Sequence, residues 1–216
     1  MSSSLVGSEM CIRDSGKIDG VSTMMMVSND LRVALLTEHM PISRVTDSIS
    51  LELVERKINM LKDTLIRDFQ KEQPKIAILS IDPHAGDGGV ISENDAKLIV
   101  PAVKKSKEIG ILIDGPFPAD SFFGSMEYKK YDLIIAAYHD QGLIPFKTLS
   151  FGMGVNYTSG LERIRTSPDH GTAYSIAGKG VASKDSFLSS IYLAIDLFKR
   201  RKIYDESRKN KLQTSQ

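Results

Sequence analysis

Short apolar runs alternate with amphipathic stretches along this chain. Three runs rich in β-branched residues span 31–37, 75–81 and 133–138. Each is apolar enough to be a buried strand of a parallel sheet. Shorter runs at 111–113 and 155–158 predict two further strands. The pattern therefore predicts an α/β fold with a mostly parallel sheet flanked by helices.

Three amphipathic segments predict long helices. Over 46–69 the apolar residues recur every three or four positions, as on one face of a helix. A second helix is expected over 93–110 and a last one over 184–201. The apolar face of the last helix is formed by Phe187, Ile191, Ile195 and Phe198. A helix or turn is expected from 139 through 147, and the polar tail 205–216 is expected to fray.

Three of the four histidines follow directly on predicted strands. His39 comes after the first β-branched run, His84 after the second and His139 after the third. Ligands of open α/β sheets bind beyond the carboxyl ends of the strands, so three imidazoles are expected at one edge. Three neutral imidazoles suit a divalent metal with an open coordination position. A single histidine there is usually a loop residue, but the threefold coincidence favours a shared metal site.

The loop DPHAGDGG places His84 among three glycines and two aspartates. Glycines there permit positive φ and a close approach of the backbone to a ligand. The plain alternative is a turn that leads into the next helix. Farther along, Lys147, Asn156 and Arg165 are of the types that bind phosphate or carboxylate groups, although solvated surface charge is the default for each.

Three short carboxylates follow predicted elements in turns. They are Asp120, Asp140 and Asp169. Each either supports a metal-bound imidazole or serves as an ordinary turn or cap residue. The sequence contains no Walker loop, no dinucleotide-binding glycine fingerprint and no serine-hydrolase elbow.

Composition mainly narrows the class of protein. The 216 residues are 41% hydrophobic and 25% charged, with a formal net charge of +1. The two signs are interspersed, which argues against a nucleic-acid or membrane partner. No apolar stretch approaches the length of a membrane span. The single cysteine, Cys11, excludes an internal disulfide and fits a reducing cytoplasm.

Six sequence motifs, in this order along the chain, resemble those of a known family. They are LRVALLTEHMP, DPHAGDGG, GPFPAD, AAYHDQGLIPFK, GVNYTSGLERIRTS and DHGTA. Together they resemble the 4-hydroxythreonine-4-phosphate dehydrogenase family of vitamin B6 biosynthesis, over about residue 22 to the end of the last helix. The resemblance implies the fold of isocitrate and isopropylmalate dehydrogenases. It implies that NAD or NADP oxidises 4-phosphohydroxy-L-threonine and that loss of CO2 then gives 3-amino-2-oxopropyl phosphate.

The resemblance also implies roles for particular residues. The family's metal ligands fall on His39, His84 and His139, and the metal would be Zn, Mg or Co. Its substrate ligands fall on Lys147, Asn156 and Arg165. Its acidic positions near the metal fall on Asp120 and Asp140. The general base is left open between Lys147 and a metal-associated aspartate, and no residue is assigned to the nicotinamide cofactor.

Family members extend farther on the N-terminal side, so the resemblance implies a truncated chain. Residues 1–15 look like translated adapter sequence and are expected to be a non-native leader. Residues 16–177 are expected to form the metal- and substrate-binding domain. Residues 178–216 are expected to be the helix and tail of an incomplete first domain, which leaves the apolar face of that helix without its partners. The family is homodimeric, with histidines of both subunits in one active site.

Other interpretations stay open at this point. A dehydrogenase of threonate or erythronate 4-phosphate would use the same metal and phosphate ligands. A phosphate acyltransferase of related fold would need no histidine triad. A metal-binding dimeric remnant would bind metal without turnover, because the chain lacks part of the family's length.

Overall fold

The computed structural model describes residues 21–150, 152–169, 174, 177–181 and 183–209. In this part of the chain seven strands form one sheet in the order β4-β3-β5-β2-β1-β6-β7. The strands are β1 (Thr23–Val27), β2 (Arg32–Leu35), β3 (Lys75–Leu79), β4 (Leu112–Phe117), β5 (Leu133–Ala136), β6 (Val155–Ser159) and β7 (Thr166–Pro168). The expected leader 1–15, Cys11 and all of the DHGTA string except Asp169 lie outside the described residues.

The sheet has a parallel half and an antiparallel half. β4, β3, β5 and β2 pair in parallel. β1 pairs antiparallel with β2 and β6, and β6 pairs antiparallel with β7. The α/β class with flanking helices is confirmed, but the sheet is mixed rather than mostly parallel. The difference arises because β1 and β7 were not predicted: β1 is rich in methionine, and β7 has only 3 residues.

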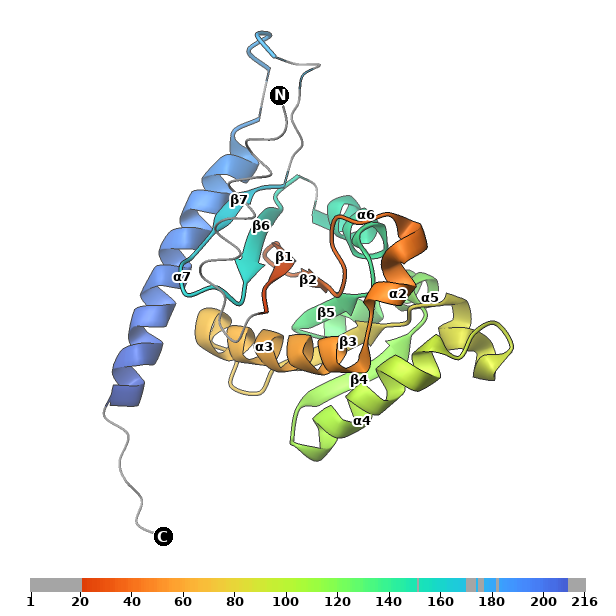
Figure 1. Cartoon of the computed structure of the whole chain (residues 1–216). Helices are drawn as coiled ribbons and strands as arrows, with labels where there is room; N and C mark the ends of the chain where they lie inside the picture. Colours follow the sequence, from red (N-terminus) through yellow and green to blue (C-terminus); the bar gives the residue numbers. More distant parts are fainter. Residues whose placement is uncertain (1–20, 151, 170–173, 175–176, 182, 210–216) are drawn as a thin grey trace.

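Helices cover both faces of the sheet (Figure 1). They are α2 (Val45–Ser48), α3 (Leu51–Phe69), α4 (Val100–Glu108), α5 (Ala119–Gly124), α6 (His139–Ser150) and α7 (Asp185–Lys209). Ser50 caps the start of α3, because its Oγ accepts a hydrogen bond from the Leu53 N–H. One apolar core lies between the sheet and α3 with α4, and a second lies between the sheet and α5 with α6.

The predicted helices and strands are found, with shifted limits. The segment 46–69 is divided between α2 and α3, and the segment 93–110 contains a π-helical turn (Asp95–Ile99) followed by α4. β4 continues to Phe117, so the first half of GPFPAD is strand rather than turn. The last helix continues to Lys209, so residues 205–209 are helical rather than frayed.

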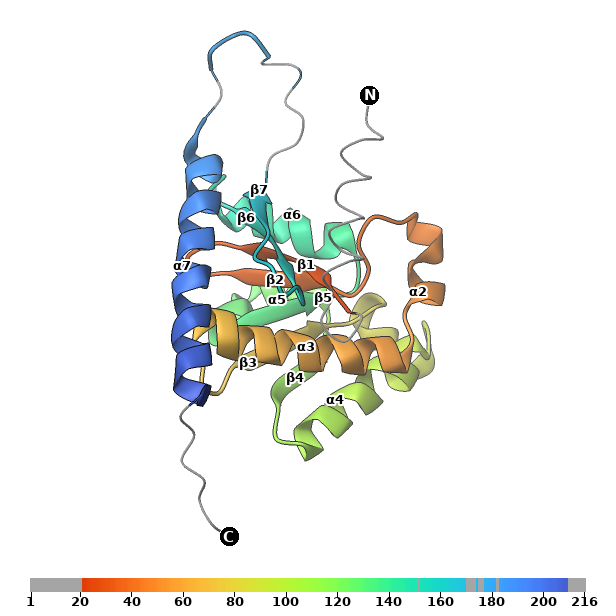
Figure 2. The same cartoon turned by 60° about the vertical axis from the view of Figure 1, so that its left-hand side comes forward.

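α7 packs against the antiparallel half of the sheet and against α3, as Figures 1 and 2 both show. The side chains that it buries are Ser186, Ser190, Leu197 and Arg201. Its predicted apolar face is turned outward instead, with exposed fractions of 54% at Phe187, 40% at Ile191, 43% at Ile195 and 65% at Phe198. Leu197 in the apolar core and polar contacts together hold this helix on the sheet, and an apolar stripe faces away from it.

A buried ionic cluster accounts for this orientation of α7. The Arg201 guanidinium donates to both carboxylate oxygens of Asp68 on α3 and to the hydroxyl of Tyr157 on β6. Tyr157 also donates to Asp68. Asp68 and Tyr157 are fully buried. Burial acts to raise the pKa of Asp68, but the hydrogen bonds from Arg201 and Arg67 outweigh it and hold that pKa below its usual range.

Within the described residues no helix combines the length and apolar character needed to cross a bilayer.

Candidate functional site

The predicted site residues follow the ends of neighbouring parallel strands. Asp120 follows β4, His84 follows β3, His139 follows β5 and His39 follows β2. These four strands are adjacent in the sheet and run in the same direction. Because neighbouring strands lie about 4.8 Å apart, the topology brings all four residues to one edge of the sheet.

His39 and His139 form the closest pair at this edge. Their ring centroids are 5.4 Å apart and the ring planes are inclined by 47°. Two imidazoles that share a tetrahedral cation, with metal–nitrogen bonds of about 2.0–2.1 Å, have centroids roughly 5 Å apart. Both histidines line a cavity of about 290 Å³ together with Glu38, Tyr138 and Asp140. The centroid separation of the pair is therefore the one expected for two ligands of one divalent metal.

A carboxylate partner orients one of these rings. The Nδ1 of His139 donates to Oδ1 of Asp140 at 2.7 Å. This contact fixes the tautomer in which Nε2 carries the free lone pair. A carboxylate behind a histidine is the usual support of a metal-bound imidazole. The role expected for Asp140 stays a prediction.

His84 lies in a left-handed turn. The φ angles from residue 84 to 88 are 53°, 52°, 78°, 47° and 61°. Left-handed backbone costs an L-residue about 1–2 kcal/mol, and His84, Ala85 and Asp87 all adopt it. Glycine is required at Gly86, because a Cβ there would lie 2.3 Å from the carbonyl oxygen of Ser92. The turn holds His84 at the surface in a strained conformation.

A buried aspartate anchors the base of this turn. The carboxylate of Asp95 accepts hydrogen bonds from the N–H groups of Ile81 at 2.8 Å and Asp82 at 3.1 Å. The side chain of Asp82 in turn accepts one from Asn94 at 2.8 Å. Burial raises the pKa of Asp95, against the opposing effect of its two backbone donors. These contacts fix the path of the chain from β3 into the turn.

The three histidines do not meet within one copy of the described chain. No group of three or more His, Cys, Asp or Glu side chains in residues 21–209, apart from the gaps given above, lies close enough to hold one metal ion. His39 and His139 are adjacent, and His84 is separate from them. The three-histidine ligand set stays a prediction.

A second group of predicted residues lies on β6 and after it. Asn156 and Thr158 point toward the face that α6 covers, because Tyr157 between them packs on the α3 face. Arg165 donates from Nη1 to the hydroxyl of Thr158 at 3.0 Å. The Oδ1 of Asn156 is buried and has no hydrogen-bond partner. An orphaned buried acceptor costs about 1–3 kcal/mol, so a ligand that donates to it would be favoured.

Lys147 is placed apart from the histidine pair. It is exposed on α6, eight residues after His139, which is about 12 Å along the helix axis. Lys147 and Asn156 stay predictions as substrate ligands, and within one copy the structure does not bring Lys147 to the His39–His139 pair.

Sequence reasoning missed three residues that shape this edge. Thr37 and Gln141 make side-chain hydrogen bonds between the strand ends. Lys57 of α3 is buried, and its Nζ donates to the carbonyl oxygens of Leu35 and Leu36 at the end of β2. Thr37 and Gln141 lie within two of the strings quoted above, but their hydrogen bonds to Ala137 and to Ser80 join residues 100 and 61 positions apart, and the partners of Lys57 are also distant in the sequence. Only the fold makes their roles visible.

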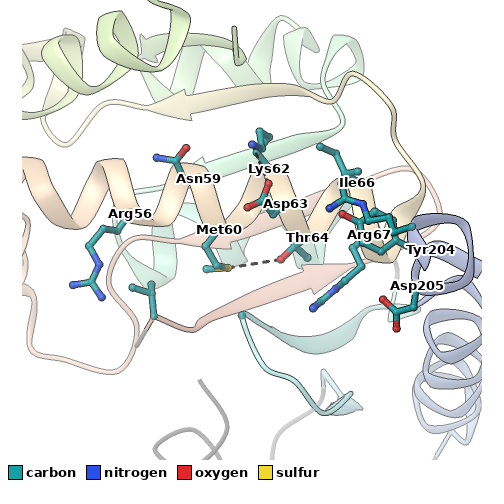
Figure 3. A pocket seen from close by; sticks show the side chains of 13 residues that line it. Arg56, Asn59, Met60, Lys62, Asp63, Thr64, Ile66, Arg67, Tyr204 and Asp205 are labelled. Atoms are coloured by element: carbon teal, nitrogen blue, oxygen red, sulfur yellow. Dashed lines mark hydrogen bonds and ion pairs between the residues drawn. The ribbon is translucent and has the colours of Figure 1, made fainter. Parts of the chain in front are cut away.

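A larger cavity of about 600 Å³ lies between α3 and α7, away from the histidines (Figure 3). Its cationic side chains have partners: Arg67 pairs with Asp68 at 2.9 Å, and Lys62 pairs with Asp63 at 2.9 Å. The guanidinium of Arg208 stacks on Tyr204. This cavity offers no cluster of catalytic groups, so the histidine edge is the better candidate for the active site.

Comparisons with known proteins agree on one family. The family model described as "Pyridoxal phosphate biosynthetic protein PdxA" matches residues 7–194. The 4-hydroxythreonine-4-phosphate dehydrogenase of Bacteroides thetaiotaomicron is 49% identical over 191 residues, which cover 88% of this chain and 52% of the relative. That of Prosthecochloris aestuarii is 46% identical over 167 residues, 77% of this chain and 49% of the relative. The chain thus spans about half the length of these curated relatives.

Solved structures give the same result for the fold. The 4-hydroxythreonine-4-phosphate dehydrogenase of Klebsiella pneumoniae superposes with a TM-score of 0.72 at 36% identity, over 82% of this chain and 53% of that one. A terephthalate 1,2-cis-dihydrodioldehydrogenase of Burkholderia xenovorans superposes with a TM-score of 0.66 at 26% identity, over 81% of this chain and 55% of that one. The expected isocitrate/isopropylmalate dehydrogenase-like fold is confirmed by these neighbours.

Proposed function

The chain belongs to the PdxA family of pyridoxal phosphate biosynthetic proteins, and from this premise we propose that it carries the metal- and substrate-binding part of a cytoplasmic 4-hydroxythreonine-4-phosphate dehydrogenase. The reaction would be the oxidation of 4-phosphohydroxy-L-threonine by NAD or NADP with loss of CO2. The observation that carries the proposal is the His39–His139 pair with Asp140 behind it, at the carboxyl edge of the parallel strands.

His39 and His139 would supply two nitrogen ligands to a zinc, magnesium or cobalt ion. When bound, a divalent cation polarises the substrate hydroxyl and stabilises the negative charge left on that oxygen after decarboxylation. Asp140 keeps the ring of His139 in the ligating tautomer. Asp120, at the end of the neighbouring β4, supplies a further carboxylate at the same edge.

The anionic end of the substrate would bind on the α6 face of β6. Arg165 brings a guanidinium to this face for that anionic end, and the orphaned Oδ1 of Asn156 would accept a hydrogen bond from a donor group of the substrate, such as its hydroxyl or ammonium. Lys147 would supply a second cation from α6. Phosphate is well matched by a fork-shaped guanidinium and a lysine ammonium. These groups would bind and orient the substrate, so that its reacting carbon meets the hydride acceptor in one geometry.

The complete site would form between two copies of the chain. The separation of His84 from the other two histidines supports a ligand set drawn from both copies. Apolar side chains next to the pair support an interface: Met40 is 37% exposed and Ile42 is 70% exposed, and both line the same cavity as His39. Lys147 and a metal-associated aspartate, Asp120 or Asp140, both remain candidates for the general base. We assign no residue to the nicotinamide cofactor.

The test is metal content together with turnover. The chain is purified, its metal is quantified by mass spectrometry, and NAD-dependent oxidation of 4-phosphohydroxy-L-threonine is assayed. A chimera that adds the unmatched half of the Bacteroides thetaiotaomicron relative is assayed in parallel. We expect metal in both proteins and turnover in the chimera. Absence of metal from both proteins would overturn the proposal.

Two controls define the site and the substrate. His84→Ala is expected to abolish metal binding, and a variant that retains stoichiometric metal would remove His84 from the ligand set. Threonate 4-phosphate and erythronate 4-phosphate are assayed beside the proposed substrate. Faster turnover of either would assign the chain to a sister activity on the same metal site.

A further inference from the structure

A cavity of about 310 Å³ lies at the edge of the sheet opposite to the histidines. β2 begins at this edge with Arg32, which lines the cavity, and its carboxyl end leads to His39. β1 ends at the same edge with Val27, and β6 begins there with Val155. α7 forms one wall of the cavity. The cavity is therefore separate from the candidate active site.

The side chain of Arg32 carries an unused hydrogen-bond donor. Its Cζ lies 4.9 Å from the centroid of the Phe69 ring. Its Nη1 donates to the carbonyl oxygen of Asp132 at 3.3 Å, which is longer than the usual range of about 2.7–3.2 Å. Its Nε is buried and has no hydrogen-bond partner among the described residues. An unpaired buried donor is unfavourable, so a ligand that accepts from this Nε would be favoured.

Arg200 of α7 brings a second guanidinium to the cavity. Its Nη1 donates to the carbonyl oxygen of Asp68 at 3.4 Å, which is a similarly long contact. Among the described residues neither guanidinium forms an ion pair with a carboxylate. Burial lowers the pKa of Arg32; the charge of Asp132 opposes this effect and the charge of Arg200 adds to it. Two cations close together in a partly buried cavity favour the binding of an anion.

The acidic groups nearby leave room for such an anion. Of the described residues that line the cavity, Asp196 alone has a carboxylate, so the two guanidiniums outnumber it. The carboxylate of Asp132 is already occupied, because it pairs with Lys71 at 2.8 Å and accepts from the N–H of Lys75 at 2.9 Å. The lining therefore keeps a positive charge that the protein does not balance locally.

Three uncharged donors also line the cavity. They are the amide of Asn29 and the hydroxyls of Ser189 and Tyr192. None of these side chains makes a hydrogen bond to another described residue. Phosphate accepts hydrogen bonds on several oxygens, and fork-shaped guanidiniums match its geometry. Ligand cavities usually measure about 300–1,000 Å³, so this one suits a phosphate group on a small molecule.

We propose that this cavity is a second anion site, which binds a phosphate group between Arg32 and Arg200. The Nε of Arg32 would donate to one phosphate oxygen and the guanidinium of Arg200 to another. The inference does not depend on the proposed function. Arg165, which that function assigns to the substrate, lies at the other end of β6, where its carbonyl accepts from the N–H of Thr158 at 3.0 Å.

The experiment follows the arginine Nε–H groups of the isotopically labelled 216-residue chain by NMR while inorganic phosphate is added. The signal of Arg32 is identified by its absence from Arg32→Lys. We expect this signal to shift and to saturate. Arg200→Gln should weaken phosphate binding about 10–100-fold, because a hydrogen bond between two charged groups is lost.

Lys199→Gln is the matched control. Lys199 is exposed on the same helix and does not line the cavity. Its substitution removes the same charge as Arg200→Gln, but solvent and salt screen an exposed cation. Phosphate affinity should therefore stay within about twofold of the wild type. Equal losses in the two variants would overturn the site, because net charge alone would then explain the binding.

Other outcomes separate this site from the proposed substrate site. No phosphate-dependent shift of the Arg32 signal, or wild-type affinity in Arg200→Gln, would overturn the proposal. Binding that is lost in Arg165→Gln and kept in Arg200→Gln would belong to the substrate site, and the second anion site would be rejected. If circular dichroism shows that Arg200→Gln is unfolded, Arg200→Lys is titrated instead. If both are unfolded, Arg200 is a residue of the fold itself and the proposal is rejected.

A parallel titration with glycerol 3-phosphate identifies the source of the phosphate group. Tighter binding of the ester than of inorganic phosphate, with the same dependence on Arg200, would support the site and assign it to a phosphorylated small molecule. Equal binding would support the site and assign it to the free ion.

Discussion

Asp68 and Arg201, 133 positions apart in the sequence, form a two-point ion pair between α3 and α7. Nε of Arg201 lies 2.7 Å from Oδ1 of Asp68, and its Nη2 lies 3.0 Å from Oδ2. The Asp68 side chain is fully buried and the Arg201 side chain is 10% exposed. Such a pair contributes to stability chiefly because either partner alone would be left buried and charged.

Removal of Arg201 should therefore destabilise the fold strongly. Arg201→Met keeps most of the volume but leaves the Asp68 carboxylate with Arg67 as its remaining cation. We expect the free energy of unfolding to fall by about 3–5 kcal/mol, measured by urea denaturation. The control is Glu52→Gln, which breaks the exposed Arg56–Glu52 pair at 3.8 Å. A surface pair contributes at most about 1 kcal/mol, so equal losses in the two variants would contradict the assignment.

The same pair predicts how stability depends on pH. Because the pKa of Asp68 is lowered in the fold, its contribution is fully present above the unfolded value of about 3.9 and is lost as pH falls through the folded value. Asp132, whose pKa is also lowered, acts in the same direction. We expect stability to decline below about pH 4. Urea midpoints across the acid range should show a shallower decline in Arg201→Met than in the wild type.

Loss of the Asp140 charge should weaken metal binding without lowering the stability of the fold. Asp140→Asn keeps an acceptor for His139 but removes the negative charge that holds the imidazole as a ligand. Metal affinity should fall about 10–100-fold, measured by competition with a chelator. The Asp140 side chain is 72% exposed, so the urea midpoint should be unchanged. Asp63→Asn, a remote carboxylate on α3 that is 70% exposed, should alter neither quantity.

Gly142 should tolerate no side chain. In Gly142→Ala the new methyl group would lie 3.0 Å or less from atoms of Val33, Ala136 and Leu35. Overpacking of this kind costs about 1–3 kcal/mol and should displace the start of α6. Gly124→Ala is the matched control, because a Cβ there meets nothing within 4 Å. Thermal melts should separate the two, and a Gly142→Ala protein as stable as the control would contradict the close packing.

The strands of the parallel half of the sheet could be predicted from the sequence. β2, β3 and β5 are buried on both faces and read as continuous apolar runs. β1 is also a buried apolar run, but its three methionines are not β-branched, and β7 has only 3 residues, so both were found only in the structure. The orientation of α7 could not be predicted from periodicity, because it depends on a charge pair between residues 68 and 201. Local pattern carries no information on such distant contacts.

For the candidate site, the sequence predicted which residues lie at the edge of the sheet but not how they are arranged there. Strand ends predicted which residues gather at one edge, and parallel topology places them there. Positive φ was expected at the glycines of the loop after β3, and Gly86, Gly88 and Gly89 have it. That His84, Ala85 and Asp87 share this conformation was not predictable, because L-residues avoid it. The separation of His84 from the other two histidines was not predictable either, because strand ends specify the edge of the sheet at which residues lie and not the distances between their side chains.

Both outer strands of the sheet carry a proline. Pro116 lies in β4 and Pro168 in β7. Proline has no N–H, so neither border of the described sheet presents an unbroken row of donors to a passing strand. Growth of the sheet by stacking copies edge to edge is thereby discouraged. A protein that exposes an apolar helix stripe is in this way protected at the borders of its sheet from forming fibrils.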